Sequence, residues 1–236
     1  MAITAGWLIA VIAQATGRAA LLHHHALIEG GPPLWVAVPL FLLSWQVMIV
    51  AMMLPTSVRS IAAFTLETGV LGRPGRSLVT FLGAYALVWA TFGLLAFMGD
   101  FLLHHVVDVT PWLATRRWLI EAGVVTLAGA YQLTPLKRRS LEACRNPAHL
   151  LSTTAAPHRG ALELGLDHSL TCLGSSWALM LLMFAGGFAN LLWMVALTAV
   201  MLYETTGTHG QRAARGAGVL LLLLAAVVVF IPWAGV

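Results

Sequence analysis

Charged residues are scarce in this chain. Asp, Glu, Lys and Arg make up only 9% of its 236 residues, and hydrophobic residues make up 59%, whereas about a quarter of a typical soluble domain is charged. This shortage excludes an ordinary soluble globular domain. Because a bilayer-spanning helix needs about 20 consecutive apolar residues, the composition predicts an all-α fold. We expect a polytopic transmembrane helical bundle that forms one integral membrane domain over residues 1–236.

Other absences narrow the range of functions. The sequence contains no GxxxxGK, HExxH, GxGxxG or GxSxG motif, so ATP-driven pumping, zinc proteolysis and hydrolase chemistry lack their usual signatures. Its two cysteines, Cys144 and Cys172, do not form a CxxC pair and are too few to staple a fold of this size. The net charge of +4 is small enough for membrane topology to explain. We therefore expect no nucleic-acid partner.

Seven apolar windows approach the length of a membrane span. Pro55 is expected to end or kink the second by removing a backbone donor, and the Gly186-Gly187 pair predicts a turn between the fifth and sixth. The fourth is the weakest, because it is short and carries Glu121. Only the loop over residues 134–159 is long enough for a small structured element. The predicted spans lie near residues 6–22, 34–54, 77–98, 118–133, 162–185, 188–204 and 216–233.

Basic residues gather in alternate loops of this arrangement. Ten of the thirteen Lys and Arg residues follow the second, fourth and sixth spans. Cytoplasmic loops collect such residues, so the N-terminus is expected inside and the C-terminus outside, in a cell membrane that we expect to be a bacterial inner membrane. The ten residues are Arg59, Arg73, Arg76, Lys137, Arg138, Arg139, Arg145, Arg159, Arg212 and Arg215.

The fifth predicted span carries a stripe of polar and soft side chains. At 100° per residue, His168, Cys172, Ser175 and Ser176 fall on one helical face, and Met183 continues it. Imidazole, thiolate and thioether groups suit a soft ion, of which Cu(I) is the best match. The alternative is a helix-packing face, since small residues let transmembrane helices approach closely.

Methionines of the second span lie toward the same, cytoplasmic end. Met48 and Met52 are four residues apart, and Met53 follows directly. Thioethers bind Cu(I), but methionine also fills gaps in apolar cores. On its own this group therefore fits either ligation or packing.

Soft groups from distant parts of the chain reach the same predicted depth. The sixth span adds a seam with Met194 and Met201, and Glu204 at its cytoplasmic end is interpreted as snorkelling toward water. The coincidence predicts a shared metal site in the inner half of the bilayer. Its candidate ligands are Cys172, His168, Met52, Met53, Met48 and Cys144.

A second candidate site faces outside in this topology. Asp100, His104 and Asp108 repeat every four residues, which places two carboxylates and an imidazole on one helical face. The first loop on the same side contains His23, His24 and His25. Imidazole with carboxylate suits Zn(II) or Cu(II). The alternative is a solvated interfacial face with a polar loop opposite.

Three motifs resemble those of a known family. The first reads Trp45-x-x-Met48-x-x-Ala51-Met52-Met53-x-Pro55, the second Tyr131-Gln132-x-Thr134-Pro135-x-Lys137 with Cys144-Arg145-x-Pro147, and the third Cys172-x-Gly174-x-x-Trp177-x-Leu179-Met180 with Trp193-Met194 and Glu204. In this order they resemble the predicted metal-binding integral membrane proteins of domain of unknown function 2182, over residues 35–215. The resemblance implies a multispan helical protein associated with a metal, for which copper is expected.

Two positions depart from the family pattern. Ser175-Ser176 stand where a further cysteine often follows Gly174, and Ser140-Leu141 stand where Cys-Leu is common before Cys144. Fewer thiolates weaken a Cu(I) site. Methionine and His168 would then complete the ligand set, or the chain has lost the metal and kept the scaffold.

These observations predict a copper-handling integral membrane protein that binds or relays Cu(I) and does not use it for turnover. Cys144 is expected to act where copper enters or leaves. The expected partners are the lipid bilayer and either other membrane protein subunits or a copper chaperone. The alternative is a non-catalytic structural or accessory subunit of a larger membrane enzyme complex. A third hypothesis is an oxidoreductase in which Tyr131, His168 and a metal act on a membrane-soluble substrate.

Overall fold

The computed structural model describes residues 2–16, 33–70, 74–116, 118–146, 160–186 and 190–230. Across these ranges every regular element is a helix, which confirms the all-α prediction. The helices are α1 (Ala2–Ala15), α3 (Leu34–Met52), α4 (Leu54–Val70), α5 (Pro74–Val109), α6 (Pro111–Ala114), α7 (Trp118–Gln132), α8 (Pro135–Arg145), α10 (Ala161–Gly186), α11 (Leu191–Thr206) and α12 (Gly210–Phe230).

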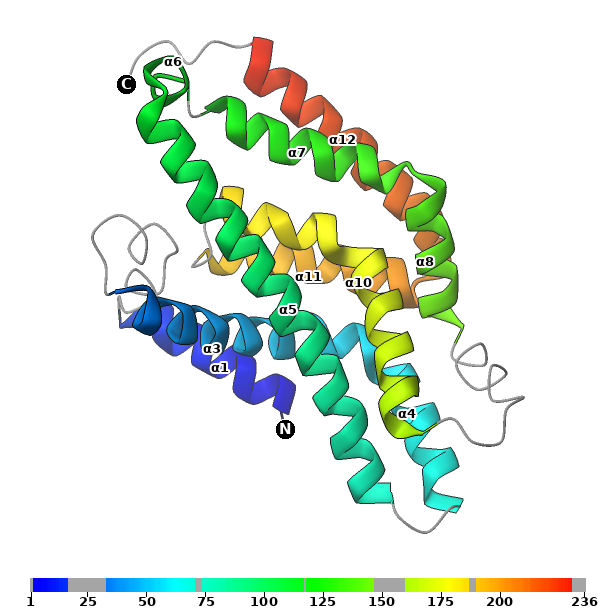
Figure 1. The fold of residues 1–236 in the computed structure, drawn as a ribbon. Coiled ribbons are helices and arrows are strands. Elements are labelled where there is room, and N and C mark those ends of the chain that lie inside the picture. Colours follow the sequence, from blue (N-terminus) through cyan, green and yellow to red (C-terminus); the bar gives the residue numbers. More distant parts are fainter. Residues whose placement is uncertain are drawn as a thin grey trace.

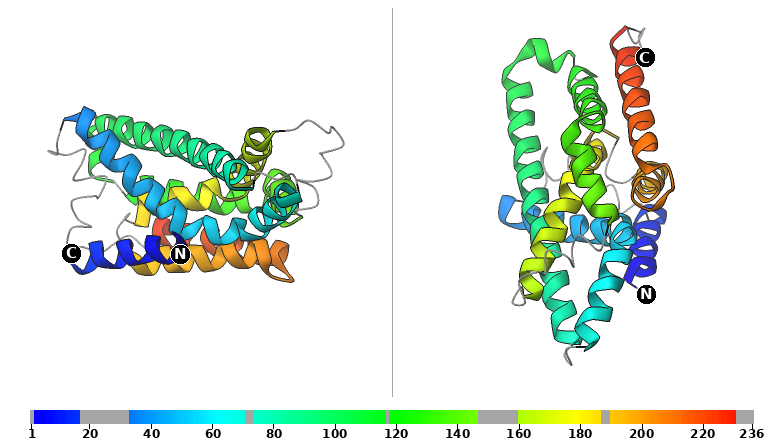
Figure 2. Two further views of the ribbon diagram at one scale, coloured as in Figure 1. Left: turned by 90° about the horizontal axis from the view of Figure 1, so that it is seen from below. Right: turned by 90° about the vertical axis from the view of Figure 1, so that its right-hand side faces the viewer.

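The described parts of the predicted apolar windows fall mainly on α1, α3, α5, α7, α10, α11 and α12. Residues 17–22, 188–189 and 231–233 of these windows lie outside the described residues. In Figure 1, successive members of this set run in opposite directions between the left and right of the bundle. In Figure 1, α4, α8 and the first turn of α12 lie toward the right, and the first turn of α5 lies at the lower right; the left view of Figure 2 shows the same segments toward the right. These segments, which carry basic residues, therefore lie toward one end of the bundle.

Within the described ranges, three helices are long and apolar enough to cross a membrane: α3, α5 and α12. The apolar helices α1 and α11 are shorter, with 14 and 16 residues, and α7 has 15. The prediction of membrane-spanning helices is supported to this extent. The count of seven spans and their orientation stay predictions. The third window, 77–98, is the middle of a 36-residue helix, because nothing at its expected end interrupts the helix.

A single large core joins these helices, with α10 packed against α5, α7, α8 and α11. Two side chains of α3 donate to backbone carbonyls of α5. Trp45 Nε1 lies 2.8 Å from the Trp89 oxygen, and Gln46 Nε2 lies 2.8 Å from the Ala86 oxygen. The indole N–H of Trp45 and an amide N–H of Gln46 therefore each have a backbone acceptor on α5, as buried donors require.

Pro55 interrupts the second predicted span as expected: α3 ends at Met52, and α4 begins at Leu54. A proline has no N–H to donate to the carbonyl four residues earlier, and that carbonyl belongs to Ala51. Trp7 of α1 fills the gap, since its Nε1 donates to the Ala51 oxygen over 3.1 Å. Gly6 lets α1 come close, because a Cβ there would lie 3.2 Å from the Ala51 nitrogen. The break thus becomes the docking point of α1.

Gly93 offers a direct test of the contact between α3 and α5. A Cβ at this position would lie 2.6 Å from Nε1 of the fully buried Trp45. We expect Gly93→Ala to lower the free energy of unfolding by about 1–3 kcal/mol through overpacking, measured by denaturant unfolding in detergent micelles. Gly83→Ala, on the same helix with nothing within 4 Å, should be neutral or stabilising by up to about 1 kcal/mol. Equal losses in both variants would contradict the close packing.

Candidate functional site

The two cysteines meet in the interior, although 27 residues separate them in the sequence. Cys172 lies on α10 and is 1% exposed, and Cys144 lies in the last turn of α8 and is 7% exposed. Both thiols are free. Interaction with the Cys172 thiol, together with burial, raises the pKa of the Cys144 thiol well above its usual value. Two sulfur donors from different helices are thus neighbours in the interior.

Two hydroxyl groups lie beside the Cys172 sulfur. Tyr85 Oη of α5 lies 3.4 Å from Cys172 Sγ, and Ser57 Oγ of α4 lies 3.9 Å from it. Ser57 also donates to Tyr85 Oη over 3.4 Å. Ser57 reaches this position because the proline break redirects the chain at the start of α4. There Thr56 Oγ1 donates to the Met53 carbonyl over 2.7 Å.

His168 lies one helical turn before Cys172 on α10 and is 3% exposed. Its ring stacks on Phe81, with centroids 5.6 Å apart, and on Tyr85, with centroids 5.9 Å apart. Its buried Nε2 has no hydrogen-bond partner among the described residues. An unpaired polar atom in a dry interior costs about 1–3 kcal/mol, so this nitrogen is the kind of group that a bound ligand would satisfy.

Methionine side chains dominate the rest of this interior. Seven of the nine methionines of the chain are at most 5% exposed and belong to the same buried cluster as Cys172. The predicted ligands Met48, Met52 and Met53 are among them, at 4%, 0% and 0% exposure. The others are Met180, Met183, Met194 and Met201.

An ion pair fixes α8 beside the cysteines. Lys137 Nζ lies 2.6 Å from Glu204 Oε2, and both side chains are only 2% exposed. Lys137 also donates to the Ser175 carbonyl of α10, and Gln132 Nε2 donates to Glu204 Oε1 over 2.7 Å. The interpretation of Glu204 as a snorkelling side chain is therefore wrong: its carboxylate is buried and fully paired.

The C-terminal end of α8 is tied to α11 as well. Arg145 donates through Nη1 to the Glu204 carbonyl over 2.5 Å and through Nη2 to the Gly207 carbonyl over 2.7 Å. At the other end, Thr134 caps the helix by accepting from the Lys137 backbone over 3.2 Å, and Pro135 occupies the first turn, where its missing N–H costs nothing. Cys144 is thus carried by a short helix that is anchored on both sides of it.

Sequence reasoning missed Tyr85, Ser57 and the pairing of Lys137. A buried ionisable residue in an apolar helix was a usable signal for Glu204, because such residues are rare in membrane segments without a partner. Its partner lies 67 residues away, so no local pattern could identify it. Tyr85 sits in an apolar run that offers no signal of its own.

The outer candidate site is only partly assembled. His104 Nδ1 lies 2.9 Å from the Asp100 carbonyl and 3.6 Å from Asp100 Oδ1, whereas Asp108 is exposed. His23, His24 and His25 lie outside the described residues. In the described ranges no three His, Cys, Asp or Glu side chains come close enough to hold a metal ion. A metal role for these six residues stays a prediction.

A protein-family model described as PpoB2, copper chaperone, matches residues 42–228, most of the chain. The chain belongs to this copper chaperone family. The match supports the copper association expected from the sequence motifs. The description of the family model does not mention domain of unknown function 2182, so the resemblance to that family stays a prediction. No curated protein and no solved structure matches the chain.

The described interior fits what a copper chaperone must offer. Thiolate, thioether and imidazole groups are the soft and borderline ligands that Cu(I) prefers over carboxylates. Two buried thiols, the His168 imidazole and buried methionines supply all three kinds in the described interior, and Cys172 shares one apolar cluster with the methionines. The assignment of ligands to these residues is a proposal.

The buried ion pair gives a prediction that is independent of copper. Glu204→Gln leaves the Lys137 ammonium without a carboxylate, so we expect the free energy of unfolding to fall by about 3–5 kcal/mol. The double variant Lys137→Met with Glu204→Leu should lose less than either single variant, because no charge is then left unpaired. Denaturant unfolding in micelles measures both.

The matched control is Glu142→Gln, which alters the exposed pair in which Arg138 Nε lies 3.4 Å from Glu142 Oε1. An exposed pair contributes about 0–1 kcal/mol, so this variant should change little. If Glu204→Gln is as mild as Glu142→Gln, the ion pair does not anchor α8.

Proposed function

We propose that the protein is a membrane-embedded chaperone that holds Cu(I) between the sulfur atoms of Cys172 and Cys144 and passes it on unchanged. The observation that carries the proposal is the approach of two buried thiols from different helices, beside the methionine-rich core that contains Cys172. Neither cysteine is needed to staple the fold, since both are free. Their approach from two helices therefore supports a role in binding.

Cu(I) is the cargo that suits this environment best. Cu(I) is bound readily by sulfur ligands, and each thiol releases its proton when it binds the metal. Two thiolates around one Cu(I) leave a single negative charge. Lys137 acts electrostatically on Cys144 from the neighbouring turns of α8, and a cation so placed favours that charge.

His168 and the methionines of α3 complete the proposed ligand set. His168 offers the unpaired Nε2 one turn from Cys172, and Met52 and Met53 lie in the same cluster at the proline break. Met48 lies one turn further along α3 and would serve as a neighbouring thioether. These groups replace the cysteines that the family pattern places after Gly174 and before Cys144.

The topology that we propose has seven spans, with the N-terminus inside and the C-terminus outside. The alternating directions of the long helices support it (Figure 1), as does the gathering of α4, α8 and the starts of α5 and α12 at one end. These segments carry Arg59, Arg76, Arg145 and Arg215, as the cytoplasmic side of a bilayer requires. Copper would then be exchanged with a cytoplasmic partner near Cys144 or handed to another membrane subunit.

Copper binding by the purified protein tests the proposal. We expect one Cu(I) per chain under reducing conditions, measured by elemental analysis and by competition with a Cu(I) chelator. Cys172→Ser and Cys144→Ser should each weaken binding by more than the roughly 10–100-fold typical of losing an outer-shell partner. Met52→Leu should weaken it less, because a second thioether, Met53, lies beside it.

The control is Met98→Leu, a partly buried methionine packed against the same cluster but outside the proposed ligand set. It should leave the affinity unchanged. A wild-type chain that binds no copper under any redox condition, yet co-purifies with other membrane chains, would instead favour the accessory-subunit hypothesis. Equal affinity in the wild type and Cys172→Ser would place the copper elsewhere.

The role of His168 can be tested separately by copper K-edge X-ray absorption. Phenylalanine preserves the ring stacking on Phe81 and Tyr85, so His168→Phe should fold normally. We expect the nitrogen scatterer of the Cu(I) complex to disappear in this variant while the sulfur scatterers remain. An unchanged spectrum would show that Nε2 is not a ligand.

A further inference from the structure

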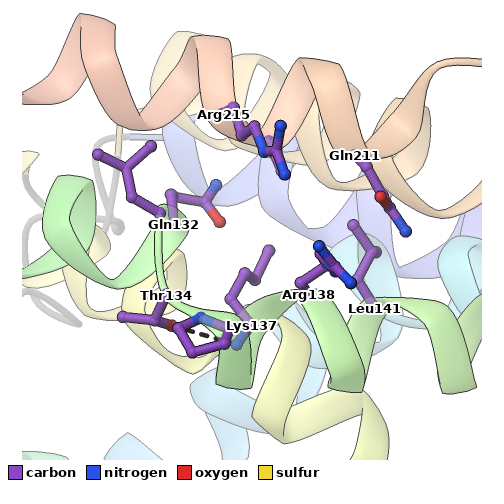
Figure 3. Close-up of a pocket in the computed structure, with 10 residues that line it drawn as sticks. Gln132, Thr134, Lys137, Arg138, Leu141, Gln211 and Arg215 are labelled. Atoms are coloured by element: carbon purple, nitrogen blue, oxygen red, sulfur yellow. Dashed lines mark hydrogen bonds between the residues drawn. The ribbon is translucent and has the colours of Figure 1, made fainter.

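A small pocket opens between α7, α8 and α12, away from the cysteines. Its volume is about 160 Å³, far above the roughly 10–15 Å³ that a single water needs, so it can hold a group of several atoms. Figure 3 shows Arg215 and Gln211 of α12 on one side, and Arg138 and Lys137 of α8 on the other. The lining is thus cationic on two opposite walls.

Much of this positive charge is uncompensated. Lys137 is neutralised by Glu204, and Arg138 shares Glu142 with Gln211, whose Nε2 donates to Glu142 Oε1 over 2.6 Å. Arg215 forms no hydrogen bond or ion pair with any described residue. The two guanidinium groups line one pocket whose described lining residues include no carboxylate, so they repel each other unless an anion lies there.

An apolar track leads away from the pocket along α12. Val219, Leu223 and Val227 follow Arg215 at four-residue spacing and are 50%, 60% and 50% exposed. Residues four apart are neighbours on the surface of a helix, so the track continues from Arg215 along α12. A charged head group followed by an exposed apolar stripe is the arrangement that a phospholipid would match, with its phosphate at the arginines and an acyl chain along the helix.

We propose that this pocket binds a phosphate group, and that the head group of an anionic phospholipid supplies it. Arginine is suited to this task because its planar fork donates two parallel hydrogen bonds to phosphate oxygens. Gln132 of α7 and Gln211 of α12 also line the pocket, and each amide nitrogen already donates one hydrogen bond to a carboxylate. The site is separate from the copper ligands and stands independently of the proposed function.

The chain offers a matched pair of double variants. Arg138→Gln with Arg215→Gln removes both pocket arginines. Arg139→Gln with Arg212→Gln removes two exposed arginines of the same helices that do not line the pocket. Both doubles change the net charge by the same amount. A third variant, Arg138→Lys with Arg215→Lys, keeps the charge and loses the bidentate geometry.

Native mass spectrometry of the full chain, released from nanodiscs of mixed phosphatidylglycerol and phosphatidylcholine, measures the bound lipid. We expect the wild type and the Arg139/Arg212 control to retain phosphatidylglycerol preferentially. In the Arg138/Arg215 glutamine double variant, the amount of bound phosphatidylglycerol should fall at least tenfold. The lysine double should fall between them. Unfolding in micelles, unchanged in all variants, verifies that the loss is not due to misfolding.

Inorganic phosphate forms the second arm of the experiment. One outcome is that phosphate binds the delipidated protein, that this binding depends on Arg138 and Arg215, and that the protein shows no lipid preference. This outcome would overturn the phospholipid as the source of the phosphate group, while the pocket would still be a phosphate site. Equal lipid loss in both glutamine doubles would show attraction by overall charge only. That result, or a wild type without preference for phosphatidylglycerol, would overturn the site.

Discussion

The pairing of Lys137 with Glu204 is the interaction on which the rest of the interior depends. A charge withdrawn from water needs a partner and hydrogen bonds for its remaining groups, and here Gln132 and the Ser175 carbonyl supply them. The network joins α7, α8, α10 and α11 through side chains that would otherwise be costly to bury. Its geometry fixes α8 against α10, and the approach of Cys144 to Cys172 follows from that position.

The proline break plays the corresponding role on the opposite side of Cys172. Pro55 releases the Ala51 carbonyl and turns the chain, so that Met52 and Met53 close α3 while Ser57 of α4 reaches the sulfur. The cost of the broken helix is offset by Trp7, which arrives from α1. A buried lysine and a proline at a helix break, both uncommon in apolar helices, therefore define the surroundings of Cys172.

Local physics made part of this architecture predictable. The helix break before Pro55 follows from a missing donor, and the all-α class follows from the scarcity of charge. Membership of a copper-related family could be inferred from ordered motifs around Met52, Lys137 and Cys172. The extent of α5 was underestimated, because an apolar window marks only the part of a helix that contacts lipid or core, and the polar end around Asp100 and His104 continues the same helix.

Other features could not be predicted because they depend on long-range packing. The partner of Glu204 is 67 residues away, and without it a glutamate near a helix end is best interpreted as reaching for water. Tyr85 and Ser57 approach Cys172 only once α4, α5 and α10 are packed together. The two cysteines were assigned to a common depth by topology, yet how closely they approach depends on how the short helix α8 docks.

That docking has a consequence for how a metal could leave. One sulfur belongs to α10, deep in the bundle, and the other to α8, which is held by polar contacts at Lys137 and Arg145 rather than by a long apolar face. If α8 separated from the bundle, the two sulfurs would move apart, and a bound metal would lose one of its two thiolate ligands. Whether the metal stays bound would then depend on how firmly α8 packs against the bundle, and the oxidation state of the metal would not change.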